Sequence, residues 1–197
     1  MNREQLKQLI LQSLEHERGG VEVYETAVEA AVNDDLREQW TEYLEQTRTH
    51  VQILEGVCKK FEIDAEEESP GRKIVRGLGA ALVAAMKEAR AAGEPGAAQL
   101  VACECVTLAE TKDHADWELL GKCAENLSGE QRATLAEACE QVEDQEDEHL
   151  YHTKGWGREL WIAALGMPAV LPPPEEEKDV KTAIGAARAK KARREML

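Results

Sequence analysis

Residues 10–28 read ILQSLEHERGGVEVYETAV, and this stretch decides how we expect the chain to fold. Its apolar residues recur every three or four positions, which is the spacing of one face of an α-helix: Ile10, Leu14, Val21, Tyr24 and Val28. Between Leu14 and Val21 the same stripe is continued by Glu17. Because an unpaired carboxylate is costly to bury, such a group is usually paired or holds a metal. The stretch therefore predicts a helix that carries a functional acid on its buried face.

Two later stretches interrupt an apolar stripe in the same way. Leu100, Cys103 and Thr107 lead to Glu110 and then to Trp117. The last long stretch runs through Leu135 and Val142 to Glu146 and His149, and then to Trp156 and Leu160. We expect Glu17, Glu110, Glu146 and His149 to point into one interior, which is how carboxylate metal sites are built in helical bundles.

The composition favours an all-α protein. The chain has 197 residues, enough for one domain with a substantial core, and strong helix formers dominate it. No stretch alternates apolar and polar residues as a half-buried strand does. The pattern predicts helices at about 2–32, 35–62, 70–92, 97–126 and 128–165. We expect the third to be a crossover and the other four to form an antiparallel bundle over residues 1–166.

The C-terminal part differs from the bundle. Residues 167–174 contain four prolines and predict a stiff, extended linker. Residues 175–197 predict a basic tail helix, since seven Lys and Arg face two acids between Lys178 and Leu197. This helix could pack on the bundle, contact a partner chain, or bind nucleic acid or another anionic surface.

Net charge and cysteine content limit the partners and the cellular compartment that we expect. The net charge of −15 disfavours nucleic-acid binding by the body of the protein. We find no signal peptide and no apolar run near the ~20 residues of a membrane span, so we expect a cytoplasmic protein without membrane contact. The five cysteines lack CxxC spacing, which favours small apolar residues in a reducing compartment over a zinc or redox role: Cys58, Cys103, Cys105, Cys123 and Cys139.

Glu146 and His149 lie three residues apart on one helix, so both side chains can reach one ion. Glu110 completes the ligand set of the second half. The first half offers Glu17 and His50, but Thr47 stands where a second bridging acid would be expected.

The remaining histidines and aromatic residues are weaker candidates. His114 follows Glu110 by one turn and could replace a missing ligand. His16 and His152 are expected on exposed faces. Tyr24 could hydrogen-bond a site carboxylate, although core packing is the simpler role for it, as for Trp117.

Carboxylate and imidazole ligands suit iron or manganese, and imidazole also suits zinc. The alternative is a metal-free polar network, which can persist in a core when every member is satisfied.

A glutamate followed seven residues later by an aromatic residue, and then Glu-x-x-His, resembles the ferritin-like superfamily, which includes rubrerythrins and bacterioferritins. A closer likeness is to the YciE/YciF-like ferritin-like stress proteins, and it covers about residues 1–165. Two stretches carry it: the Glu-x-Thr-x-x-His-Val-x-x-Leu-Glu pattern of residues 45–55, and LVACECVTLAETKDHADWELL at residues 100–120. The resemblance implies a bundle that often dimerises. It implies either O2 or peroxide chemistry at iron or manganese, or a non-enzymatic stress protein without metal. Thr47 departs from the full metal motif, which predicts little ferroxidase activity.

Overall fold

The computed structural model describes residues 1–173, 191 and 194, and this part of the chain contains five α-helices and no strand. They are α1 (Arg3–Ala30), α2 (Asp34–Lys60), α3 (Pro70–Ala91), α4 (Pro95–Glu125) and α5 (Gly129–Ala164). The predicted all-α class is confirmed for these residues. The predicted tail helix at 175–197 and the end of the linker lie outside the described residues, apart from positions 191 and 194.

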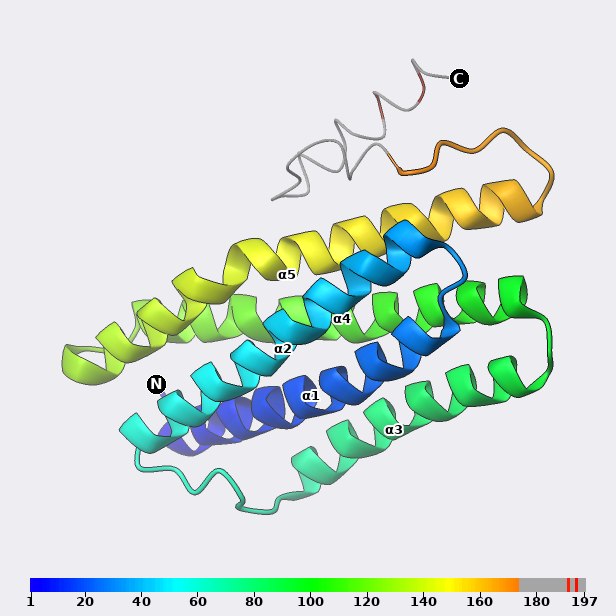
Figure 1. The fold of residues 1–197 in the computed structure, drawn as a ribbon. Coiled ribbons are helices and arrows are strands. Elements are labelled where there is room, and N and C mark those ends of the chain that lie inside the picture. Colours follow the sequence, from blue (N-terminus) through cyan, green and yellow to red (C-terminus); the bar gives the residue numbers. More distant parts are fainter. Residues whose placement is uncertain (174–190, 192–193, 195–197) are drawn as a thin grey trace.

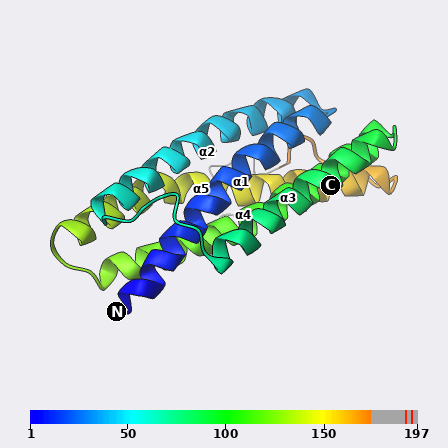
Figure 2. The same ribbon diagram turned by 90° about the horizontal axis from the view of Figure 1, so that it is seen from below.

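The helices form two hairpins joined by a crossover helix. α1 and α5 run in one direction and α2 and α4 in the other (Figure 1). Because α2 and α4 are parallel, the chain must return between them, and α3 makes this return. Figure 2 shows α3 along one side of the bundle, where it packs against α1 and α4.

Most of the helix ends follow the expected local chemistry. Asn33 accepts a hydrogen bond from the Leu36 amide and caps α2, a position for which asparagine is strongly preferred. Ser69 caps α3 in the same way, with Pro70 in its first turn. Ser128 and Gln131 have the sequence spacing of a capping box before α5, but the Ser128 side chain makes no capping bond. Gly129 there has φ +62°, a left-handed conformation that differs from the helical start a capping box requires.

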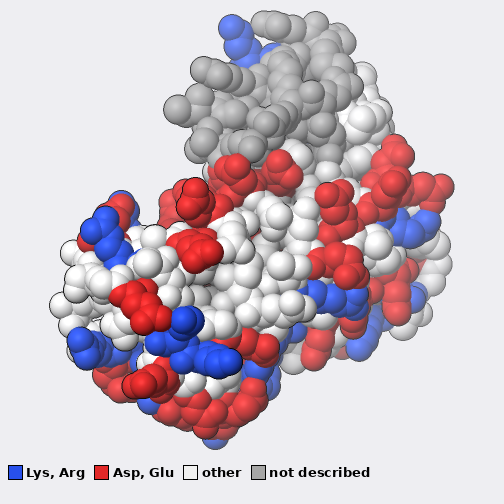
Figure 3. Space-filling model, turned by 60° about the vertical axis from the view of Figure 1, so that its left-hand side comes forward, with Lys and Arg blue, Asp and Glu red and all other residues white. Residues whose placement is uncertain are grey.

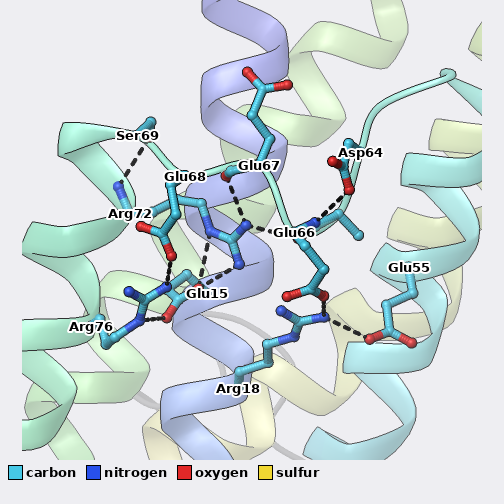
Figure 4. A network of polar contacts seen from close by, with 11 residues as sticks. Glu15, Arg18, Glu55, Asp64, Glu66, Glu67, Glu68, Ser69, Arg72 and Arg76 are labelled. Atoms are coloured by element: carbon cyan, nitrogen blue, oxygen red, sulfur yellow. Dashed lines mark hydrogen bonds and ion pairs between the residues drawn. The ribbon is translucent and has the colours of Figure 1, made fainter.

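An ionic network fixes the crossover to α1 (Figure 4). Arg72 is 1% exposed, and its guanidinium donates to Glu15 and to the backbone carbonyls of Ala65 and Glu67. Arg76 contacts the second oxygen of the same glutamate at 2.5 Å. Burial raises the pKa of Glu15, but the two arginines outweigh this effect and lower it. A buried acid on α1 thus binds α3, and Arg72 in turn binds the segment before α3.

The core has two apolar parts with a polar layer between them. One is built around Tyr24, Trp40 and Trp156, and the other around Leu14 and Trp117. Close helix contact depends on small residues here: a Cβ atom added at Gly20 would lie 3.2 Å from the Thr47 side chain. None of the helices in the described part combines the length and the apolar character needed to cross a membrane.

Candidate metal centre

Five of the predicted ligands lie together in the middle of the bundle. Each is at most 3% exposed, and they come from all four bundle helices: Glu17 from α1, His50 from α2, Glu110 from α4, and Glu146 and His149 from α5. Each helix places its ligand on the apolar face that packs inward, so assembling the bundle brings the five together.

Glu146 is the centre of this cluster. Its Oε1 lies 3.1 Å from Nδ1 of His50 and 3.6 Å from Nδ1 of His149. Glu17 approaches the first imidazole at 3.4 Å, and Glu110 approaches the second at 3.6 Å. Two ligand triads result, Glu17–His50–Glu146 and Glu110–Glu146–His149, and within each the ligand atoms lie within 4.8 Å of one another. Glu146 of the second half therefore provides the first triad with the carboxylate that Thr47 does not supply.

Two glutamines orient the histidines. Nε2 of His50 lies 2.7 Å from Oε1 of Gln145, and Nε2 of His149 lies 2.7 Å from Oε1 of Gln46. An amide oxygen only accepts hydrogen bonds, so each imidazole must donate from Nε2. Nδ1 of a neutral ring is then an acceptor that faces the carboxylates. This is the tautomer that a metal-ligating histidine needs, held by an outer partner as in known metal sites.

The inner polar atoms lack hydrogen-bond partners. They are Nδ1 of both histidines, both oxygens of Glu146, Oε2 of Glu17 and Oε2 of Glu110. Buried groups of this kind are normally satisfied, so acceptors that face one another require either protons or a cation between them.

The aromatic residues that follow the two glutamates also belong to the centre. Nε1 of Trp117 donates to Glu17 at 2.8 Å. Tyr24 is fully buried, and its pKa is raised well above the ordinary value by burial and by neighbouring Glu110. Trp117 thus bonds the glutamate of the other hairpin, whereas Tyr24 lies near Glu110 and its buried hydroxyl lacks a hydrogen-bond partner.

The contacts relate the two hairpins by an approximate two-fold repeat. One constant offset aligns α1 with α4, and another aligns α2 with α5. The aligned positions are Glu17 with Glu110, Tyr24 with Trp117, Gln46 with Gln145, Thr47 with Glu146, and His50 with His149. Each glutamine bonds the histidine of the opposite hairpin, so the repeat is one of contacts as well as of sequence.

Burial sets the protonation of the carboxylates. It raises the pKa of Glu110 to about 8 and that of Glu146 to about 7. The pKa of Asp113, which is also buried, is raised well above its ordinary value by burial and by the charge of Glu146. Protons therefore compete for these oxygens near neutral pH.

The two imidazoles shift in opposite directions. Burial alone would lower the pKa of His50, but the charges of Glu17 and Glu146 outweigh it and raise the pKa well above the usual value. Burial lowers the pKa of His149 to about 4.

Three histidines lie elsewhere. Nε2 of His114 contacts Asp147 at 2.7 Å, and neither triad includes it. The prediction that His16 and His152 are exposed is wrong. His16 is half-buried with Nε2 2.9 Å from the Ala109 carbonyl, and His152 is 7% exposed with Nδ1 2.7 Å from the Tyr43 hydroxyl. Each helix of a bundle has two neighbours, which cover more of its surface than one apolar stripe indicates.

Sequence reasoning missed the roles of three residues. Gln46 and Gln145 were not predicted to serve the site, and Trp117 was expected only in the core. The signal that could have found the glutamines is their position, directly before Thr47 and Glu146 in the two halves.

Comparison of the chain with protein-family models, with curated proteins and with solved structures found no match.

Proposed function

We propose that this chain is a ferritin-like protein that binds iron or manganese at the buried centre through Glu17, His50, Glu110, Glu146 and His149. The observation that carries the proposal is the orientation of the two imidazoles. Each is held by a glutamine so that Nδ1 faces carboxylate oxygens within 3.6 Å. Hard oxygen donors with imidazole nitrogens are the ligand set that iron and manganese share.

The geometry favours unequal occupancy. Glu146 is the one carboxylate that belongs to both triads. The Thr47 hydroxyl donates to the Tyr43 carbonyl at 2.9 Å and so provides no second bridge. Two neighbouring divalent ions repel each other strongly at low dielectric, and bridging acids offset that repulsion. We expect one ion to bind tightly and a second ion weakly.

The bound metal would supply redox chemistry toward O2 or peroxide, and the chain itself supplies ligands, burial and proton acceptors. With only one shared carboxylate, rapid oxidation of two Fe(II) per chain is not expected. The proposal includes a homodimer, as the resemblance to ferritin-like stress proteins implies, and sedimentation equilibrium tests that part separately.

A metal-free protein of the same fold is the second candidate, and one observation favours it. Nδ1 of His50 lies 3.1 Å from Glu146 and 3.4 Å from Glu17, so a protonated imidazole could satisfy both acids without a cation. In that case the chain would act through dimerisation or partner binding rather than through chemistry.

Elemental analysis separates the two candidates. The protein is expressed with added iron and manganese, purified without chelator, and compared with Glu110→Gln and Glu140→Gln variants. Glu140 is an exposed residue of α5 outside both triads and serves as the matched control. We expect about one ion per chain in the wild type and in the control, and much less in Glu110→Gln. Wild-type protein that stays free of metal after reconstitution with Fe(II) or Mn(II) would establish the metal-free candidate.

A further inference from the structure

A groove of about 630 Å³ opens between α4 and α5 on one side of the bundle. Its lining includes His114, Trp117 and Gly121 from α4, and Cys139, Glu143 and Glu146 from α5. We call it the α4–α5 groove.

The groove reaches the buried centre. Glu146 lines it, although this residue is only 1% exposed and neither of its oxygens has a hydrogen-bond partner. Trp117, which donates to Glu17, forms another part of the lining. Glu146, which belongs to both triads, thus forms part of the lining of a space that opens to solvent.

The other hairpin fills the equivalent space. In the aligned positions, Val28 stands for Gly121, Trp40 for Cys139 and Leu44 for Glu143. Trp40 is fully buried, Leu44 is 8% exposed, and Val28 packs against the same apolar cluster. Small and polar residues therefore keep the space open on the α4–α5 side, at positions where the α1–α2 hairpin carries large apolar side chains.

The charges along the groove suit a cation. Glu118 and Glu143 are exposed on its walls, and Asp147 lies deeper with His114. Lys122 is also on the wall, and its charge is paired with Glu125 at 2.8 Å. Acidic side chains are also spread over the face of the molecule drawn in Figure 3. A cleft lined by one sign of charge raises the local concentration of counter-ions and their rate of association.

We propose that the α4–α5 groove is the route by which a divalent cation reaches the buried centre, with the His114–Asp147 pair as a transit site on the way. This inference rests on the proposed metal-binding function.

The test blocks the groove without touching a ligand. An added Cβ at Gly121 meets no atom within 4 Å, so Gly121→Trp places an indole at the groove wall without a backbone clash. Gly77 on α3 has the same free surroundings and lies outside the groove lining, so Gly77→Trp is the matched control. Uptake of Co(II) from a fluorescent metal indicator is followed by stopped flow, and the final cobalt content is measured after prolonged incubation.

We expect Gly121→Trp to take up Co(II) several-fold more slowly than the wild type and the control, and to reach the same final content. A second variant, Glu118→Gln with Glu143→Gln, should lower the rate at low ionic strength and weaken its salt dependence, because screening acts on exposed charges. Equal uptake rates in the wild type, Gly121→Trp and the double variant would overturn the route while leaving the centre intact. Wild-type protein that takes up no Co(II) even after prolonged incubation would overturn the proposed function and the route with it.

Discussion

The α1–α2 and α4–α5 hairpins share one plan but differ in their acids. Both place a glutamate, a glutamine and a histidine at aligned positions. Where the second hairpin has Glu146 and Asp113, the first has Thr47 and Gly20. The Thr47 side chain lies 3.2 Å from the place that a Cβ at Gly20 would take, so the first hairpin has small residues where the second one buries two acids. One hairpin thus supplies the carboxylate, Glu146, that contacts the histidines of both hairpins.

The crossover helix adds a second difference. α3 covers the α1 side, where Glu15 is buried with Arg72. The aligned residue on α4 is Leu108, which is 62% exposed. An acid in one half and an exposed leucine in the other thus mark which hairpin carries the crossover.

The largest expected effect concerns the packing of α3 on α1. Arg72→Ala should lower the free energy of unfolding by about 3–5 kcal/mol, because it leaves the buried Glu15 paired only with the half-exposed Arg76 and removes the donor to the Ala65 and Glu67 carbonyls. Arg90→Ala removes a surface pair with Glu29 and should cost only about 0–1 kcal/mol. Urea unfolding followed by circular dichroism measures both. Similar losses in the two variants would mean that the buried network does not hold α3 in place.

The next effect tests the shared carboxylate. Glu146→Ala should weaken metal binding by more than the roughly 10–100-fold typical of losing an outer partner of a ligand, because both triads lose a ligand. Thr47→Ala should leave the affinity for the first ion nearly unchanged. Isothermal titration with Mn(II) gives both affinities. If Glu146→Ala retained wild-type affinity, the assignment of the centre would be wrong.

The two glutamines provide a matched pair for comparing the halves. Gln46→Ala releases His149, and Gln145→Ala releases His50, so each should weaken metal binding by about 10–100-fold. We expect the larger loss from Gln46→Ala. His149 belongs to the triad with Glu110 and Glu146, and all three of these residues come from the α4–α5 hairpin. The same titration decides the order, and a larger loss from Gln145→Ala would move the tight site to the first hairpin.

Proton competition predicts the pH dependence of binding. A metal ion needs the ionised carboxylates, and the pKa values of Glu110 and Glu146 are raised to about 8 and about 7. Affinity should therefore rise as the pH increases from 6 to 8, by up to about tenfold per pH unit for each proton displaced, and should level off above that range. Titration calorimetry in buffers of different ionisation enthalpy measures the protons released. Affinity that is constant over this range contradicts the assigned ligands.

The smallest expected change is a gain. Thr47→Glu copies the second hairpin into the first and supplies a second bridging acid, so bound metal should rise from about one ion per chain toward two. Thr47→Ser keeps the hydroxyl and should behave as the wild type. Elemental analysis of both variants after reconstitution with Fe(II) checks this, and an unchanged content in Thr47→Glu would show that bridging charge does not limit occupancy.

The periodic pattern of the sequence determined the helices and most of the candidate ligands. Glu17 lies on the apolar stripe of residues 10–28. It therefore points inward whenever this stripe faces the core, because the side-chain direction follows from the helical repeat. The same reasoning predicted the inward positions of Glu110, Glu146 and His149, and all four lie together in the structure.

Only the tertiary structure decided which of these side chains lie together and what surrounds them. Glu146 joins both triads, and Gln46 reaches His149 across the bundle, because distances between helices depend on packing rather than on spacing along the chain. The same packing turns His114 toward Asp147 instead of the centre and leaves the α4–α5 groove open beside Gly121. The spacing of residues along the sequence indicates which face of a helix a residue occupies. Contacts between the faces of different helices depend on the positions of all the helices.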